Sequence, residues 1–237
     1  MAALYPSSVD QTGETLPFVT FADFEAFGEG TREVSKASVI AYTPLLTTEA
    51  ELLAWNVYSV NNSQWIAQGR AFEPTLGSIL NATDNKKQTR SWSAGNAEHS
   101  LKTGITEYVY HIDSTGRAIS EAGEGPFTPL WQMSPVLTDL RMVNFNLASK
   151  PLYAGLVEYA SITGLPILSE PVNPEEFFGT WANENENGSP HSILVQPVYN
   201  GFAHEKEQEV VGTVTALLSW ENFFEDVSES LSICRSA

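Results

Sequence analysis

The sequence predicts an α+β fold in which a helical segment is followed by two antiparallel-sheet lobes in tandem. Three observations lead to this prediction. A unit of proline-containing strand, loop, strand and helix occurs twice, with Pro129 and Pro197 marking the copies. Leu152 in the helix of the first copy corresponds to Trp220 in the helix of the second copy, and the two are separated by the same 68 residues as the two prolines. With 237 residues and 42% hydrophobic side chains, the chain can bury one large core or two small ones. The alternative is that any α+β chain offers such matches by chance.

The first copy of this unit occupies the middle of the chain. Its strands are predicted at 127–133 and 142–147, and the proline inside the first one indicates an edge strand or a bulge. Ser149 and Pro151 then predict the start of a helix, as N-cap and first-turn residue, and Gly164 predicts its end. The second copy has predicted strands at 193–199 and 210–218 and a helix from Ser219.

The residues before the first copy predict helices, one strand and a hairpin. A helix opens at Phe21, and Gly28 and Gly30 are expected to kink or end it. A strand follows at 39–46, and the pair Thr48 and Glu51 has the spacing of a capping box for the next helix. Further elements are a polar loop at 73–103, a hairpin at 105–120 that turns at 113–116, and a short strand at 165–168.

Charge and composition exclude several classes of protein. The net charge of −17 leaves no basic patch for a nucleic acid and disfavours anionic membrane surfaces. A single cysteine, Cys234, permits no internal disulfide. No apolar run approaches the roughly 18 residues of a membrane span, so membrane anchors are expected outside this stretch of chain. The sequons at Asn61 and Asn81 are weak signals of secretion.

Catalytic and cofactor motifs are not found in the sequence. His204 and Glu205 lack the second histidine of a zinc-protease motif, and the Gly-Glu-Gly triplets lack the third glycine of a dinucleotide site. The four histidines have no metal-ligand spacing. We therefore expect neither an enzyme nor a metal or cofactor. A hydrolase that uses two loop carboxylates is the least favoured alternative.

Several motifs in conserved order carry a resemblance to a known family. They are Val39–Leu45, Phe127–Leu130, Val143–Ser149 and Ile193–Tyr199. Together they resemble the CHASE domain, an extracellular sensor module of the double-PAS (Cache) type. Thr31–Glu33 and Trp220–Phe224 are also similar to the ectodomains of receptor-type nucleotide cyclases from microalgae such as diatoms.

This resemblance implies two PAS-like lobes and a receptor function at the extracellular or periplasm-like face of the plasma membrane. A small molecule of unknown class is expected to bind the membrane-distal lobe of a homodimeric receptor, whose output domain lies outside this chain. Plant cytokinin receptors have an aspartate where this chain has Pro135, so cytokinin is not supported. The implied parts are a helical segment with one strand (1–70), the membrane-distal lobe (71–172), and the membrane-proximal lobe with its exit helix (173–237).

The candidate ligand-binding residues lie on and beside the strands of the first copy. An apolar wall is predicted from Trp131, Met133 and Phe145, and polar contacts from Tyr108, Tyr110 and Asn144. Because strand side chains alternate, Trp131 and Met133 share a face that excludes Gln132. The alternatives are that these aromatic residues are plain core, and that the chain is a surface protein-interaction module without a small-molecule pocket.

Overall fold

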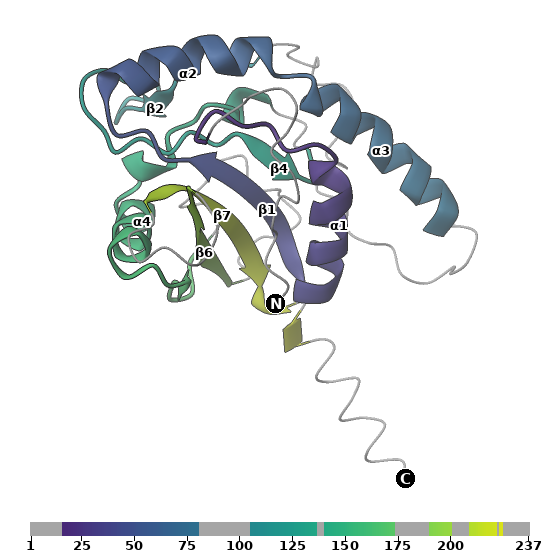
Figure 1. The fold of residues 1–237 in the computed structure, drawn as a ribbon. Coiled ribbons are helices and arrows are strands. Elements are labelled where there is room, and N and C mark those ends of the chain that lie inside the picture. Colours follow the sequence, from purple (N-terminus) through teal and green to yellow (C-terminus); the bar gives the residue numbers. More distant parts are fainter. Residues whose placement is uncertain are drawn as a thin grey trace.

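The computed structural model describes residues 16–80, 105–136, 140–173, 190–200, 209–221 and 223–224. Within these ranges the fold is mixed α+β, with one five-stranded antiparallel sheet and one two-stranded sheet (Figure 1). The large sheet has the order β4-β1-β7-β6-β5. Its strands are β1 (Ala37–Pro44), β4 (Gln132–Ser134), β5 (Ile167–Leu168), β6 (His191–Tyr199) and β7 (Val210–Ser219). The small sheet pairs β2 (Tyr110–Ile112) with β3 (Ala118–Ser120).

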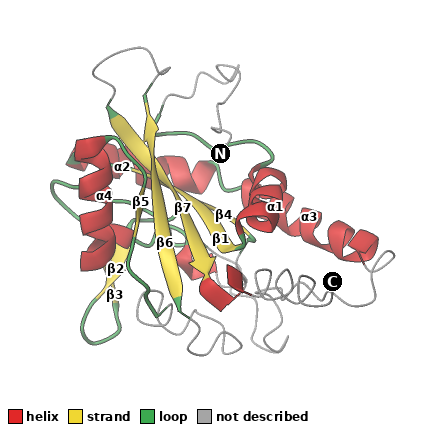
Figure 2. Ribbon diagram, turned by 90° about the horizontal axis from the view of Figure 1, so that it is seen from below, coloured by secondary structure: helices red, strands yellow, loops and turns green. Residues whose placement is uncertain are grey.

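The structure describes four α-helices beside the large sheet. They are α1 (Phe24–Ser35), α2 (Glu49–Asn61), α3 (Trp65–Leu80) and α4 (Pro151–Thr163). Helix α1 packs against β1 and β4, and α4 packs against β5 and β6 at the other end (Figure 2). The hydroxyl of Tyr153 fixes α4 to the sheet, because it hydrogen-bonds the hydroxyls of Thr43, Thr213 and Thr215 at 3.1, 3.0 and 2.6 Å.

The predicted tandem of two sheet lobes is not confirmed. Strands from all three predicted parts of the chain join the same sheet, and the sheet does not separate at residue 70 or residue 172. The reason is long-range pairing: β1 pairs with β7 from Ala37↔Leu218 to Pro44↔Gly212, and with β4 on its other side. The first strand thus lies between β4 and β7, inside a sheet that the last strands complete.

The strand predicted at 142–147 is wrong. This segment contains two 3₁₀ turns, η1 (Leu140–Met142) and η2 (Leu147–Ser149), with single bridges at Phe145 and Asn146. Asn144 lies between the turns with a φ of 69°, which breaks an extended strand. Ser149 is not the N-cap of α4: Lys150 occupies that position without a side-chain cap, and Pro151 is the first helical residue as predicted.

The helix predicted to open at Phe21 begins at Phe24 instead and continues through both glycines. Asp23, at the N-cap, has a φ of 54° and makes no side-chain capping bond. Gly28 does not end the helix and is instead a packing position. A β-carbon there would overlap the β-carbon of Ser134, so only glycine lets α1 lie this close to β4.

Other local predictions are confirmed. Thr48 and Glu51 form both hydrogen bonds of the capping box at the start of α2. The predicted hairpin forms, although its strands β2 and β3 are three residues long each. Gly164 ends α4 with a φ of 67°, the left-handed conformation that glycine adopts without strain. The polar loop predicted at 73–103 overlaps α3 as far as Leu80, and the rest of it lies outside the described residues.

The turn of this hairpin supplies a pH-dependent prediction. Oδ1 of Asp113 accepts hydrogen bonds from the Thr115 hydroxyl and from the amides of Thr115 and Arg117 at 2.7, 2.8 and 2.9 Å. The Thr115 hydroxyl leads the contacts that lower the pKa of Asp113 to about 2. A carboxylate with a depressed pKa stabilises the turn above its unfolded pKa of about 3.9, and the stabilisation is lost as the pH falls through about 2.

We expect an NMR titration of the Asp113 carboxyl to give a midpoint near pH 2. The amide shifts of Thr115 and Arg117 should follow the same midpoint, and Asp113→Asn should remove that transition. A midpoint near 3.9 would contradict the hydrogen-bonded turn.

Candidate functional site

Five of the six predicted ligand-binding residues are buried, and most of them pack as core. Trp131 is fully buried, and its ring lies edge-on to those of Trp55 and Trp65, with centroid separations of 5.3 and 5.6 Å. Its indole N–H donates to Thr20 Oγ1 at 3.2 Å. The side chain has protein neighbours on its faces and at its polar edge, so the core interpretation of Trp131 is the one that the contacts favour.

Asn144 is a buried junction between α2 and the 3₁₀ segment. Its Oδ1 accepts from the indole N–H of Trp55 at 3.0 Å, and its Nδ2 donates to Ser59 Oγ at 2.9 Å and to the carbonyl of Thr106 at 2.7 Å. These three bonds use the acceptor and both donors of the amide. The side chain therefore holds segments together and is not directed at a ligand.

The two predicted tyrosines differ in their surroundings. Tyr108 is exposed, whereas Tyr110 is buried, packs edge-on to Phe145 at 5.6 Å, and donates its hydroxyl hydrogen bond to the carbonyl of Arg141. The backbone of Tyr110 also bonds Asn144 and Asn146. Phe145 and Tyr110 thus join the small sheet to the 3₁₀ segment.

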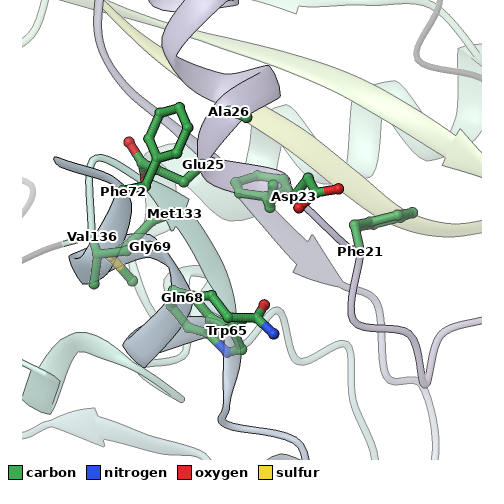
Figure 3. A pocket seen from close by; sticks show the side chains of 11 residues that line it. Phe21, Asp23, Glu25, Ala26, Trp65, Gln68, Gly69, Phe72, Met133 and Val136 are labelled. Carbon is green, nitrogen blue, oxygen red and sulfur yellow. The ribbon is translucent and has the colours of Figure 1, made fainter. Parts of the chain in front are cut away.

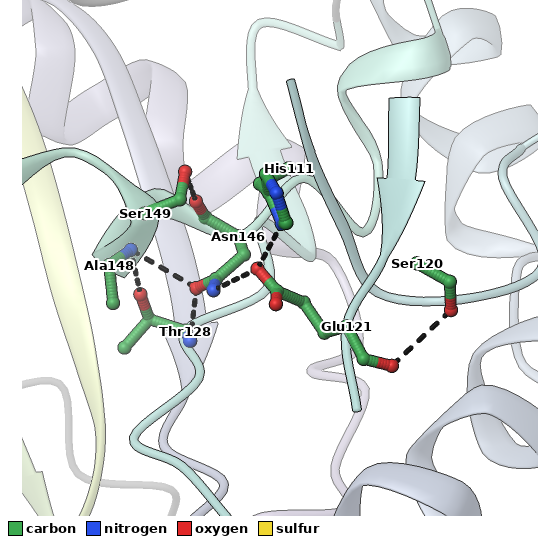
Figure 4. A network of polar contacts seen from close by, with 7 residues as sticks. All are labelled: His111, Ser120, Glu121, Thr128, Asn146, Ala148 and Ser149. Atoms are coloured by element: carbon green, nitrogen blue, oxygen red, sulfur yellow. Dashed lines mark hydrogen bonds and ion pairs between the residues drawn. The ribbon is translucent and has the colours of Figure 1, made fainter. Parts of the chain in front are cut away.

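A second polar cluster strengthens the same junction (Figure 4). The Nδ2 of Asn146 donates to Glu121 Oε1 at 2.7 Å, and that oxygen lies 3.0 Å from Nδ1 of His111. The Oδ1 of Asn146 accepts from the amides of Thr128 and Ala148 at 3.0 and 3.1 Å. Because both amide groups of Asn146 are used in bridging chain segments, the cluster acts as a structural clamp.

Met133 lines a cavity, and this cavity is the candidate site. It has a volume of about 80 Å³ and lies between α1, α3 and β4 (Figure 3). Its lining consists of the aromatic residues Phe21, Phe24, Trp65 and Phe72, the polar residues Asp23, Glu25 and Gln68, and the small or aliphatic residues Ala26, Gly69, Met133 and Val136.

Two glycines shape this cavity. Gly28 lets α1 approach Ser134, and Gly69 lets α3 approach Val136, whose Cγ2 would overlap a β-carbon at that position. Helices α1 and α3 therefore lie close to the end of β4. The side chains that line the cavity bound the space between the two helices. Asp23 and Ala26 are exposed, so the cavity opens to solvent beside the first turn of α1.

The charge of Glu25 is held in place on the wall of the cavity. Its Oε1 lies 3.2 Å from Nη2 of Arg32 and accepts the hydroxyl hydrogen bond of Ser134 at 3.0 Å. Nε of Arg32 donates to the same serine oxygen at 3.1 Å. This pairing offsets the cost of burying the carboxylate, which is only 6% exposed.

Sequence reasoning missed the cavity because it sought ligand-binding residues only on and beside the strands of the first copy. The available signals were the run of Phe21 and Phe24 beside acidic residues and a glycine, Gly69, inside a helix. Neither signal indicates that the two segments meet at β4.

Two other features are absent among the described residues. In the ranges given above, no three His, Cys, Asp or Glu side chains gather to hold a metal ion. In the same part of the chain, no helix combines the length and apolar character needed to cross a bilayer. Neither models of known protein families nor curated proteins match this chain.

Proposed function

We propose that this chain is the extracellular ligand-sensing domain of a transmembrane signalling receptor. In this proposal a small molecule binds the domain, and the resulting change passes to a cytoplasmic output domain outside the chain. The proposal includes one PAS-like lobe, since one five-stranded antiparallel sheet that takes strands from all parts of the chain agrees with one lobe rather than with two.

The observation that carries the proposal is the position of α1. Its first turn lines the cavity through Phe24 and Glu25, and its last turn leads directly into β1. There Ala37 pairs with Leu218, next to the point where β7 passes into the helical turn at Trp220. A 12-residue helix spans about 18 Å, so α1 is a rigid element between a binding cavity and the C-terminal exit of the sheet.

In this proposal the signal is a movement of α1, and the polar bonds that join α1 and the residues before it to β4 are the contacts that change. Arg32 and Glu25 attach it to Ser134, and the Phe21 backbone just before it bonds the amide of Gln132 at 2.7 and 2.9 Å. A ligand that binds more tightly to one position of α1 than to the other shifts the populations of the two arrangements. The size of the shift is set by the difference between the two affinities.

The test measures binding and movement separately. Melting of the 237-residue chain is followed against a library of amino acids, purines, organic acids and amines. A ligand at 100 times its Kd stabilises by roughly 2.7 kcal/mol, which raises the Tm by several degrees. Spin labels at Val34→Cys and Glu221→Cys, in a Cys234→Ser background, then report the distance between α1 and the exit of β7.

A sensor requires a ligand-dependent change in that distance. Binding without a change would contradict signal transmission through α1. A labelled pair at Val57→Cys and Tyr159→Cys, on α2 and α4, is the control for overall rearrangement, and we expect it to stay constant.

One observation favours a second candidate, a surface protein-interaction module. The outer face of α2 exposes Leu53, Val57 and Val60, which are 61%, 64% and 42% exposed. Large exposed apolar side chains at helical spacing are typical of interaction surfaces. This candidate predicts that no compound of the library shifts the Tm and that Val57→Asp abolishes association with a partner protein.

A further inference from the structure

The cavity between α1, α3 and β4 combines aromatic rings with carboxylates. We propose that it binds an alkylated ammonium group, such as the head group of a tertiary or quaternary amine. This inference rests on the proposed sensing function, because it names the ligand class of the same site.

Aromatic rings form much of the wall. Phe21, Trp65 and Phe72 line the cavity (Figure 3). Phe24 lines it as well, and its ring is stacked on that of Phe21 with the centroids 6.5 Å apart. A cation within about 6 Å of a ring centroid is attracted to the face of the ring, and the attraction is stronger where the cation is desolvated. Aromatic walls are the common device for holding quaternary ammonium groups.

The charges of the wall select a cation over an anion. Asp23 and Glu25 both line the cavity, and Arg32 already neutralises much of Glu25 at 3.2 Å. The carboxylate of Asp23, which makes no capping bond, supplies the remaining negative charge at the opening. The net charge of −17 also raises the local concentration of cations and lowers that of anions.

The apolar part of the cavity wall favours an alkylated ammonium group over a primary ammonium group. A primary ammonium carries three N–H donors that each need an acceptor, whereas much of the wall is formed by rings and by Met133 and Val136. Methyl groups are suited to that apolar part. The volume of about 80 Å³ exceeds the roughly 10–15 Å³ that one water needs and lies well below the roughly 300 Å³ of a drug-sized pocket, so it accommodates a head group only.

The test is calorimetric titration of the 237-residue chain with choline and with tetramethylammonium chloride. The uncharged isostere 3,3-dimethylbutan-1-ol, which replaces the ammonium nitrogen of choline by carbon, is the matched probe. We expect both cations to bind and the isostere to bind at least about tenfold more weakly, a difference of about 1.4 kcal/mol. Equal binding of choline and its isostere, or no binding of either cation, overturns the proposal.

Two variants locate the binding site. Asp23→Asn keeps a residue that tolerates the left-handed φ of 54° and removes the charge, and we expect about fivefold weaker choline binding. Phe72→Leu removes one ring and should weaken binding by a similar factor. Glu49→Gln removes an exposed carboxylate at the start of α2 and is the matched control, with binding unchanged. Equal weakening by Glu49→Gln would show a general charge effect and overturn the site.

The results also separate this inference from the sensing function. If another library compound binds and moves α1 while choline does not bind, the ligand class is wrong and the sensing function stands. If choline binds without a change in the distance between the labels at residues 34 and 221, the ammonium site stands and the sensing function is contradicted.

Discussion

Trp131→Ala is expected to destabilise the fold by about 3–5 kcal/mol, the usual cost of removing a large buried aromatic side chain. The ring is fully buried and packs against Trp55 and Trp65. Its removal leaves a cavity among the aromatic residues and takes the N–H donor from Thr20. Urea denaturation of the variant and the parent chain measures this change in the free energy of unfolding.

Phe27→Ala is the matched control, because Phe27 is also aromatic but is 61% exposed on α1. Its change should stay within about 0.5 kcal/mol, as is usual for surface substitutions. If Trp131→Ala instead left the free energy of unfolding unchanged and altered only ligand binding, the ring would be part of a pocket and its assignment to the core would be wrong.

Asn144→Ala is expected to cost about 3–5 kcal/mol for a different reason. The substitution leaves the buried indole N–H of Trp55, the hydroxyl of Ser59 and the carbonyl of Thr106 without their partner. Each such group costs about 1–3 kcal/mol, although the contributions are not additive. Alanine also suffers at the φ of 69°, which asparagine tolerates better.

Asn144→Gly separates the two causes, since glycine loses the same bonds but adopts positive φ without strain. Chemical denaturation should therefore rank the parent first, the glycine variant second and the alanine variant last. Asn61→Ala, which changes an exposed asparagine at the end of α2, should alter the free energy of unfolding by less than about 0.5 kcal/mol. A stable alanine variant would mean that the amide is not the junction between α2 and the 3₁₀ segment.

The residues predicted to line a pocket show what the alternation of a strand can predict and what it cannot. Alternation predicts that Trp131 and Met133 share a face that excludes Gln132, whose amide bonds the backbone of Phe21. It could not decide whether that face meets a ligand or another segment. The face meets Trp55 and Trp65, which come from helices more than 60 residues earlier, and no local pattern encodes such a contact.

The strand prediction for residues 142–147 is wrong for a related reason. Met142, Val143, Phe145 and Leu147 have the apolar character of a strand, and all are buried. Asn144 nevertheless adopts left-handed geometry because its side chain is fixed by Trp55, Ser59 and Thr106. Tertiary hydrogen bonds therefore overrode the local preference.

The sequence by itself determined the elements whose signals lie within a few residues: the α+β class, the capping box at Thr48, the turn at Asp113 and the end of α4 at Gly164. The tertiary structure alone decided the strand order and the candidate cavity. β1 pairs with a strand about 170 residues later, and Gly28 and Gly69 bring two helices to β4. Capping bonds and turn geometry act between near neighbours, whereas strand order and a cavity depend on which distant surfaces bury each other.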